Sequence, residues 1–380
     1  MSDAKLHVVT VVGTRPEIIR LSRVISQLNN SEAIKHTLIH TGQNYDYNLN
    51  EVFFEELEIK KPDIFLECAG KSPTETIGNI LIKIDPVLEE LHPDAFLVLG
   101  DTNSCLSALV AKKKKIPIFH MEAGNRCFDQ NVPEETNRKI VDHISDINLP
   151  YSKIARDYLL REGIQPDRII KTGSPMAEVL DFYSKKITNS TILSDLSLKS
   201  EQYFVVSSHR EENVDTLVKL EELIITLNVL IEKYGFPIIF STHPRTRKQL
   251  DKINTKPSNK IQFLEPLGFI DYVCLQKNAF IVLSDSGTIS EESSLLNFRA
   301  LNIRSSHERP EAMEETSVIM TDINKKRILL GVESMASQQD SISKFNLVED
   351  YKSLNVSKKI ERILISYTDY INKNVWKKEY

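Results

Sequence analysis

Glycine is scarce in this chain. There are 12 glycines among its 380 residues, which is about 3% where ~7% is usual. We expect a chain this poor in glycine to keep it where the backbone needs a conformation that other residues resist. Half of the glycines follow short apolar runs directly or within two residues, as ligand-facing turns of an open α/β sheet do. These six are Gly13, Gly42, Gly100, Gly124, Gly173 and Gly287.

Other shortages narrow the class of protein. The four cysteines form no C-x-x-C pair, which favours reduced thiols and a cytoplasmic protein. No apolar run approaches the ~18 residues that cross a bilayer, and the first residues are not typical of a signal peptide. With 48 basic and 53 acidic side chains, and a pI near 6.1, the chain lacks the basic face of a nucleic-acid binder.

Several cofactor motifs are also missing. The sequence contains neither G-x-G-x-x-G nor G-x-x-x-x-G-K-[ST], so neither NAD nor ATP binding is supported. It has no Asp-x-Asp, which argues against a metal-dependent sugar-nucleotide site. We therefore predict an enzyme or binding protein with no cofactor and no metal.

Apolar β-branched runs alternate with segments of helical period through both halves. This pattern predicts an α/β protein with two Rossmann-like domains, parallel sheets and a cleft between the domains. We expect strands at 6–12, 36–41, 96–99, 116–120, 146–149, 168–171, 203–207, 237–242, 260–264, 279–284, 300–303 and 317–321. Helices are expected at 17–28, 74–91, 136–144, 154–162 and 217–234.

The domain boundary is expected after residue 172, where a Gly-Ser-Pro turn leads into a Ser/Asn/Thr-rich stretch. The first domain then covers residues 1–172 and the second covers 173–355. The last helix, about 356–371, is amphipathic and must pack its apolar side on something. We assign residues 356–380 to the first domain.

Carboxylates follow three buried runs in the first half. Asp101 follows a strand and Gly100, Glu122 follows the next strand, and Glu134 and Glu135 follow Pro133. Because the carboxyl ends of parallel strands meet at one edge, these acids are expected to converge. Such a cluster is costly unless it binds cations or handles protons. A single acid of this kind is as often a helix cap.

Anion-binding turns are predicted in both halves. At residues 13–17, Gly-Thr-Arg-Pro-Glu, the N–H groups of Thr14 and Arg15 and the Arg15 guanidinium can cradle an anion. At 284–288, Ser-Asp-Ser-Gly-Thr, N–H and hydroxyl donors can bind a diphosphate. One turn later a glutamate can accept both hydroxyls of a ribose, and we favour Glu292 over Glu291. The alternatives are an ordinary turn and a capped helix with surface acids.

Cationic groups follow further strands of the second half. His209 begins His-Arg-Glu-Glu-Asn after one strand, and His243 and Arg245 follow the next. Arg309 lies in the polar turn 304–311. Each segment alone is equally well explained as an exposed loop, so the phosphate-binding interpretation depends on the set.

As a set, these segments resemble the UDP-N-acetylglucosamine 2-epimerase family, in order over residues 6–325. The segments are 13–17, 100–102, 122–124, 133–135, 209–213, 284–287 and 308–311. The resemblance implies a GT-B fold, UDP held by the second domain, a C-terminal helix packing back on the first, and a homodimer. It implies Asp101, Glu122, Glu134 and His209 as catalytic residues. It implies UDP or substrate contacts from Arg15, Arg20, His243, Arg245, Phe269, Ser286, Gly287, Thr288, Glu292 and Arg309.

A closer resemblance is to the branch that makes UDP-N-acetyl-L-fucosamine from UDP-2-acetamido-2,6-dideoxy-L-talose. It is carried by residues 41–47, the block 122–135 and His307. The N-acetylglucosamine enzymes have Lys in place of Arg20 and His-Arg-Arg-Glu in place of 209–212. Their allosteric site uses a Gln-His pair, where Asn44 follows Gln43 here. These departures argue against a glucosamine substrate and against allosteric activation.

The implied reaction is elimination of UDP from C1 as a base removes the C2 proton, giving a 2-acetamidoglycal, followed by re-addition with protonation of the opposite face. Inversion needs proton-transfer groups on both faces, hence several carboxylates. Four alternatives stay open: a UDP-N-acetylglucosamine 2-epimerase, a hydrolysing relative that releases N-acetylmannosamine, a metal-independent glycosyltransferase and a catalytically silent UDP-sugar sensor. Capsule or O-antigen assembly is the setting that the resemblance implies.

Overall fold

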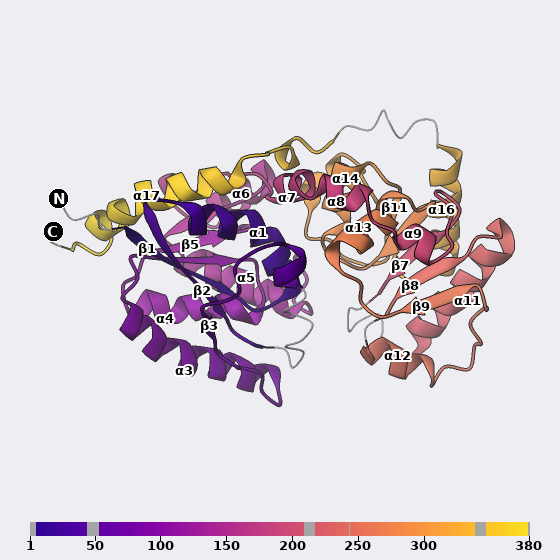
Figure 1. The fold of residues 1–380 in the computed structure, drawn as a ribbon, viewed down its shortest axis with the longest axis horizontal. Coiled ribbons are helices and arrows are strands. Elements are labelled where there is room, and N and C mark those ends of the chain that lie inside the picture. Colours follow the sequence, from indigo (N-terminus) through magenta and orange to yellow (C-terminus); the bar gives the residue numbers. More distant parts are fainter. Residues whose placement is uncertain (1–4, 44–52, 209–216, 243, 339–346, 379–380) are drawn as a thin grey trace. The chain divides into compact units, whose positions relative to one another are not determined.

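The computed structural model describes residues 5–43, 53–208, 217–242, 244–338 and 347–378. The chain forms two compact units, drawn in Figure 1. Unit 1 comprises Met1–Asp181 and Asp350–Tyr380, and unit 2 comprises Phe182–Glu349. Unit 1 thus ends nine residues after the boundary expected at 172/173, and it resumes six residues before the boundary expected at 355/356. Helix α7 (Met176–Phe182) continues unit 1 past the expected boundary, and the Ser174 N–H donates to the Asp350 carbonyl at 3.3 Å.

Unit 1 is a doubly wound parallel sheet with the strand order β3-β2-β1-β4-β5-β6. Its strands are β1 (Leu6–Val12), β2 (Ile34–His40), β3 (Ile64–Phe65), β4 (Ala95–Leu99), β5 (Ile118–Met121) and β6 (Ile147–Leu149). Its helices are α1 (Arg15–Asn30), α3 (Pro73–Leu91), η1 (Asn103–Ser107), α4 (Ala108–Lys113), α5 (Pro133–Ile144), α6 (Lys153–Arg161), η2 (Pro166–Arg168), α7, η4 (Glu349–Tyr351) and α17 (Val356–Asn374).

Unit 2 repeats this topology, because its order β12-β11-β10-β7-β8-β9 is the same winding read from the other edge. Its strands are β7 (Phe204–Ser207), β8 (Ile238–Ser241), β9 (Ile261–Leu264), β10 (Ile281–Ser284), β11 (Ala300–Asn302) and β12 (Ile319–Met320). Its helices are α8 (Ser184–Thr188), α9 (Ile192–Asp195), α11 (Leu217–Tyr234), α12 (Pro244–Leu250), α13 (Phe269–Lys277), α14 (Ile289–Leu296), α15 (Pro310–Glu314) and α16 (Lys325–Ser337).

Each sheet is buried on both faces, as expected for parallel strands between helices. In unit 1 the apolar side chains of β1 and β4, such as Val9 and Phe96, pack with Ile80 and Ile84 of α3. In unit 2, Phe204 of β7 lies in the corresponding core. Burying one such side chain contributes roughly 1.5–3 kcal/mol. The continuous apolar runs of the sequence are therefore strands of two separate cores.

Helix α17 packs along α1, as Figure 1 shows for the last segment of the chain. Glu361 of α17 accepts hydrogen bonds from Gln27 and Ser31, at 2.6 and 2.5 Å. The buried residues Ile360 and Leu364 form the apolar side of the helix. The expectation that the C-terminal helix returns to the first domain is therefore confirmed.

One expected strand is wrong. Residues 168–171 were expected to be a strand, but Pro166 begins the short helix η2, and only an isolated bridge joins Ile169 to Asn148. Proline lacks the backbone donor that a ladder needs, which is consistent with a short helical turn at this point. Conversely, the two-residue strand β3 was not expected from the sequence.

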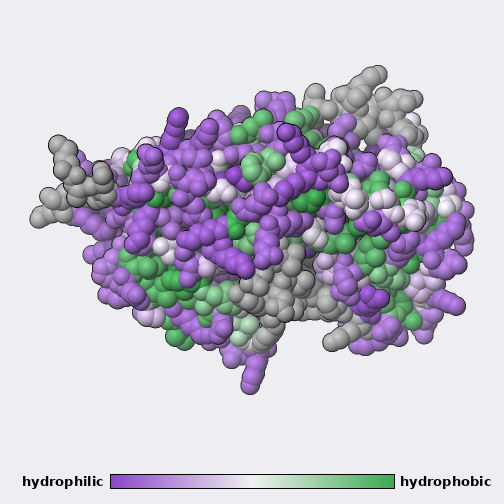
Figure 2. All heavy atoms as spheres, viewed as in Figure 1, coloured by the Kyte–Doolittle hydropathy of each residue, from purple (hydrophilic) through white to green (hydrophobic). Residues whose placement is uncertain are grey.

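Within the described residues, no helix is both long and apolar enough to cross a membrane. The face drawn in Figure 2 is mostly hydrophilic, with apolar side chains in small groups. Ile82 of α3 and Val218 of α11 are among the most exposed apolar residues, at 72% and 73%. Scattered exposure of this kind is ordinary for a globular protein.

Both units place loops where ligands bind in open α/β sheets. The strand order reverses between β1 and β4 in unit 1, and between β7 and β10 in unit 2. Ligands of such sheets bind outside the carboxyl ends of the strands at this point of reversal. The turns that follow β1, β4, β5 and β10 are therefore the places to look for function.

Candidate functional site

The turn after β1 is organised by Glu17, whose role the sequence analysis did not identify. Its carboxylate accepts from the Gly13 N–H (2.9 Å) and from the hydroxyls of Thr14 (2.8 Å), Thr102 (3.2 Å) and Ser104. Burial raises the pKa of Glu17, and these hydrogen bonds oppose that shift. Glu17 therefore joins the turn after β1 to the turn after β4.

Arg15 lies in this first turn, with its guanidinium 4.2 Å from the centre of the Phe53 ring. Gly13 is required there, since an added Cβ would lie 2.3 Å from the Thr41 hydroxyl oxygen. The turn therefore has no room for a side chain at position 13. Binding of an anion by Thr14 and Arg15 stays a prediction.

Asp101 follows β4 and is held by Arg138 from α5. The guanidinium donates through Nε and Nη2 to Asp101 Oδ2, at 3.0 and 2.6 Å. Through Nη1 it also donates to Glu135, at 2.9 Å. Burial opposes the charge of Glu135, but the Cys127 N–H and Arg138 outweigh it and hold the pKa of this carboxyl below its ordinary value. Arg138 therefore bridges two carboxylates.

Glu122 follows β5 and is held by Arg20. The two side chains are 3.2 Å apart (Nη1 to Oε2), and only 4% and 13% of them is exposed. Asn125 donates to the other oxygen of Glu122 at 3.3 Å. Glu122 has φ +66°, a left-handed conformation that a non-glycine residue adopts only at a cost in free energy. Such strain is frequent at functional sites.

The turns that carry Asp101 and Glu122 are neighbours. A Cβ added to Gly100, the residue before Asp101, would lie 3.9 Å from Glu122 Oε2. Glu134 begins α5 one turn before Arg138, and residues four apart share a helix face. The structure therefore brings the turns of Asp101 and Glu122 together, with Glu134 on the helix that binds Asp101.

Arg20 was expected to contact the substrate, and the structure pairs it with Glu122. A guanidinium beside a carboxylate stabilises the charged form, as a proton-accepting group requires. Neither the pairing of Arg20 nor that of Arg138 was predicted. The spacing of Arg138, three residues after Glu135, is a signal for their ion pair, whereas no spacing indicates its contact with Asp101.

In unit 2, the turn after β10 is closed by its own hydrogen bonds. The Ser286 N–H donates to the Ser284 hydroxyl at 3.1 Å, and the hydroxyls of Ser286 and Thr288 are 2.9 Å apart. Thr288 is the N-cap residue of α14. The hydroxyls of this turn and Gly287 thus sit at a helix N-terminus, where an anion is favoured. Their contact with a diphosphate stays a prediction.

The two glutamates of α14 have different partners, as expected from their 100° separation. Glu292 accepts from Gln276 at 2.8 Å, and Glu291 lies 3.9 Å from Arg309. Phe269 is 3% exposed and its ring lies edge-on to Tyr183, with the centroids 6.0 Å apart. Substrate contacts by Glu292, Arg309 and Phe269 stay predictions.

Some predicted residues lie outside the described part. These are His209 and His243, together with residues 210–213 and 44–47 that supported the resemblance. Arg245 lies in α12, and its side chain is outside the described part as well.

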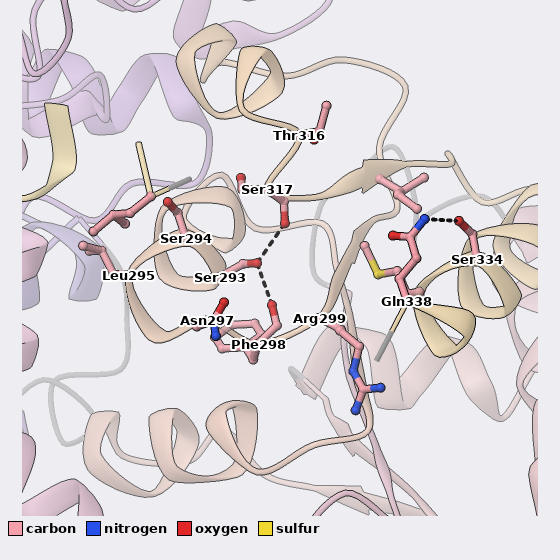
Figure 3. Close-up of a pocket in the computed structure, with 13 residues that line it drawn as sticks. Ser293, Ser294, Leu295, Asn297, Phe298, Arg299, Thr316, Ser317, Ser334 and Gln338 are labelled. Carbon is pink, nitrogen blue, oxygen red and sulfur yellow. Dashed lines mark hydrogen bonds between the residues drawn. The ribbon is translucent and has the colours of Figure 1, made fainter. Parts of the chain in front are cut away.

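A cavity of about 480 Å³ opens in unit 2 (Figure 3). It lies beside the C-terminal half of α14, between Ser293, Phe298 and Ser317, whereas the predicted diphosphate turn is at the other end of that helix. Among the residues that the structure describes, none of the predicted site residues lines this cavity. The described residues also contain no group of three or more His, Cys, Asp or Glu side chains arranged for a metal ion.

The fold and these groups define a two-domain α/β protein with ion-paired carboxylates at the strand ends of its first unit. The family model described as UDP-N-acetylglucosamine 2-epimerase matches residues 26–365. The chain belongs to this family: it is an epimerase, one of the isomerases, and the family reaction is C2 epimerisation of UDP-N-acetylglucosamine-type sugars.

Solved structures support this assignment. The chain is similar to a UDP-N-acetylglucosamine 2-epimerase from Rickettsia bellii, with 52% identity and a TM-score of 0.91 over 99% of this chain and 100% of that one. It is similar to the Methanocaldococcus jannaschii UDP-GlcNAc 2-epimerase solved with UDP-GlcNAc and UDP, with 36% identity, a TM-score of 0.87 and coverage of 95% and 99%. The fold is therefore GT-B-like.

A relative with a different named substrate also matches. The UDP-2,3-diacetamido-2,3-dideoxy-D-glucuronate 2-epimerase of Pseudomonas aeruginosa is 34% identical over 292 residues, which cover 76% of this chain and 80% of the relative. Relatives of the chain are thus named for more than one UDP-amino sugar.

Proposed function

We propose that the chain inverts C2 of a UDP-2-acetamido-2,6-dideoxy-L-hexose, converting the L-talose sugar to UDP-N-acetyl-L-fucosamine. The observation that carries the acid–base part is the pairing of Asp101 and Glu122 with separate buried guanidiniums on neighbouring turns. The choice of sugar is supported by residues 41–47, by the block 122–135 and by His307.

The proposed reaction has two steps. A carboxylate removes the C2 proton while the bond between C1 and the UDP oxygen breaks, which gives a 2-acetamidoglycal and UDP. The UDP oxygen then re-adds to C1, and a protonated carboxyl delivers a proton to the other face of C2. Asp101, Glu122 and Glu134 are proposed for these transfers, with His209 as a further acid or phosphate contact.

The second unit is proposed to hold the UDP. Charge that develops on the leaving diphosphate is stabilised by oriented N–H donors and cations. We assign this task to Ser286, Gly287 and Thr288, to His243, Arg245 and Arg309, and to Arg15 of the first unit. Phe269 and Glu292 are proposed to contact the nucleoside. A homodimer, a cytoplasmic location and a role in polysaccharide assembly belong to this proposal.

A second candidate is epimerisation of UDP-N-acetylglucosamine to the manno sugar. The names of the Rickettsia bellii and Methanocaldococcus jannaschii relatives favour it. Against it, Arg20 and the Gln43-Asn44 pair depart from the Lys and the Gln-His pair that the resemblance implies for the N-acetylglucosamine enzymes. Release of free N-acetylmannosamine would identify the hydrolysing variant.

The test is to incubate the protein separately with the two UDP-sugars in D₂O and to follow the products by NMR. We expect turnover of the 6-deoxy-L-talose substrate, with deuterium at C2 of the product. Turnover of UDP-N-acetylglucosamine alone would favour the second candidate. Epimerisation without deuterium at C2 would exclude the elimination route, and no turnover with intact UDP binding would indicate a sensor.

A further inference from the structure

Asp142 of α5 lies in a buried charge network that no step above uses. Only 1% of the residue is exposed. Its carboxylate contacts His120 at 2.9 Å and accepts from Arg126 Nη1 at 2.7 Å and from the Gly124 N–H at 3.1 Å. Burial opposes its charge, but His120 and Arg126 outweigh it, so the pKa of Asp142 lies below its ordinary value. The N–H donors of Arg126 and Gly124 around it fit an ionised carboxylate, which only accepts hydrogen bonds.

The His120 ring of β5 faces acceptors at both nitrogens. Its Nδ1 lies 2.9 Å from the Asp142 carboxylate, and its Nε2 lies 2.8 Å from the carbonyl oxygen of Gly100. Neither partner can donate, so each ring nitrogen must carry the hydrogen of its bond. This geometry fits an imidazolium at the fully buried His120, with Asp142 as its counter-ion.

This ion pair contacts both turns that carry the candidate catalytic carboxylates. His120 donates to the carbonyl of Gly100, directly before Asp101. Asp142 accepts from the N–H of Gly124, two residues after Glu122. Gly100, Glu122 and Gly124 all have positive φ, at +74°, +66° and +82°. Such turns keep their conformation only when their surroundings hold them.

We propose that Asp142 and His120 are positioning residues of the epimerase: Asp142 keeps the His120 imidazolium charged and in place, and this ion pair holds the Asp101 and Glu122 turns in their reactive arrangement. The inference rests on the proposed C2 epimerisation. The buried positive charge also favours the ionised form of carboxylates near it, and a base requires that form.

The other charged groups around the pair are each balanced by a partner. The pairs are Arg126 with Glu162, His143 with Glu162, Arg138 with Asp101 and Glu135, Lys139 with Glu135, and Arg20 with Glu122. Burial is the main cause of the raised pKa of the Cys105 thiol, and the carboxylates of Asp101, Glu17 and Asp142 add to it. Removing the charge of Asp142 thus leaves His120 without its counter-ion.

The test is Asp142→Asn in the full-length protein, after turnover of the wild type has been established. We expect kcat to fall roughly 10- to 100-fold, as for a small misplacement of reacting groups, with KM and the affinity for UDP nearly unchanged. The acid limb of the profile of kcat/KM against pH should stay close to that of the wild type, because the variant loses the negative charge of Asp142 together with the positive charge of His120. ¹⁵N NMR of the histidine rings should show a charged His120 in the wild type and a neutral ring in the variant.

Asp146→Asn is the matched control. Asp146 is equally buried, but it binds the other end of β5, accepting from the Ile118 N–H at 3.0 Å and from Lys112 at 2.6 Å. This variant should lose stability without moving the pH profile. His120→Gln is the second test variant, because the amide can still donate to Gly100 but carries no charge. It should move the acid limb up by about one unit, since it loses the positive charge while Asp142 keeps its negative one.

The outcomes separate the two hypotheses. No epimerisation of any UDP-amino sugar by the wild type would overturn the proposed function, and this inference with it. An active wild type whose Asp142→Asn and His120→Gln variants keep both kcat and the pH profile would overturn only the positioning role. A neutral His120 ring in the wild type would overturn the positioning role as well. If Asp146→Asn moved the pH profile as much as His120→Gln does, the effect would be explained by lost stability, and the positioning role would be overturned.

Discussion

Arg138 and Asp101 form a two-point contact in which Nε and Nη2 of one guanidinium reach a single carboxylate oxygen, at 3.0 and 2.6 Å. The same guanidinium donates to Glu135, and its own side chain is only 2% exposed. Removing a buried guanidinium that holds two carboxylates is costly, because the carboxylates then lose a cation that balances them. Arg138 therefore links the stability of α5 to the geometry of a candidate catalytic group.

We predict that Arg138→Lys lowers kcat by roughly 10- to 100-fold, because an ammonium cannot reproduce the fork of the guanidinium. The free energy of unfolding should fall by about 1–3 kcal/mol. Both effects can be measured by steady-state kinetics and urea denaturation. Arg156→Lys, on the partly exposed side of α6, is the control and should change neither quantity. A variant with normal kcat would mean that Asp101 does not depend on this contact.

The carboxylates themselves give the second prediction. Asp101→Asn, Glu122→Gln and Glu134→Gln should each raise the activation free energy by ~2–4 kcal/mol, as the loss of a positioned acid, base or electrostatic group does. Exchange of the C2 proton with solvent should fall with turnover. Wild-type turnover in all three variants would remove these residues from the mechanism, whatever the fold.

The positions of these acids could be predicted from the sequence, but their partners could not. Asp101 follows Gly100 at the end of one apolar run, and Glu122 directly follows the next apolar run. Both runs are predicted strands of one parallel sheet, and parallel strands end at a common edge. Their pairing with Arg138 and Arg20 depends on how α5 and α1 pack on that sheet, which periodicity does not specify. Glu17 is a similar case, because its donors come from two separate turns. The wrong strand at 168–171 contains only two apolar residues, and it overlaps a short helical turn that Pro166 begins.

Acid should destabilise unit 1 through two histidines. Burial lowers the pKa of His36 and of His40 from 6.5 to about 4. Unfolded histidine takes up its proton near pH 6.5, and the folded ring takes it up only near pH 4. Each neutral ring therefore makes its full contribution to the free energy of unfolding above pH 6.5. As the pH falls from 6.5 to 4, this contribution decreases by roughly 3 kcal/mol per ring.

Urea denaturation of the wild type between pH 7.5 and pH 4.5 tests this prediction. The urea concentration at the midpoint of unfolding should fall as the pH falls. His36→Asn removes one of the two rings, so the stability of this variant should depend less steeply on pH. Equal slopes for wild type and variant would show that His36 does not titrate as its burial suggests.

Two glycines make a matched pair for the last prediction. At Gly13 an added Cβ would lie 2.3 Å from Thr41 Oγ1 and 2.9 Å from Ser104 Cβ, whereas at Gly78 of α3 nothing lies within 4 Å. Gly13→Ala should therefore push apart the turns after β1, β2 and β4, with a loss of about 1–3 kcal/mol in stability and a clear fall in turnover. Gly78→Ala should raise the free energy of unfolding by about 0.5–1 kcal/mol, because alanine loses less conformational entropy than glycine in a helix. Thermal melts and kinetics of both variants check this. The two changes in the free energy of unfolding should have opposite signs. A Gly13→Ala protein as stable and active as the wild type would mean that the turn carrying Arg15 does not need its close approach to Thr41.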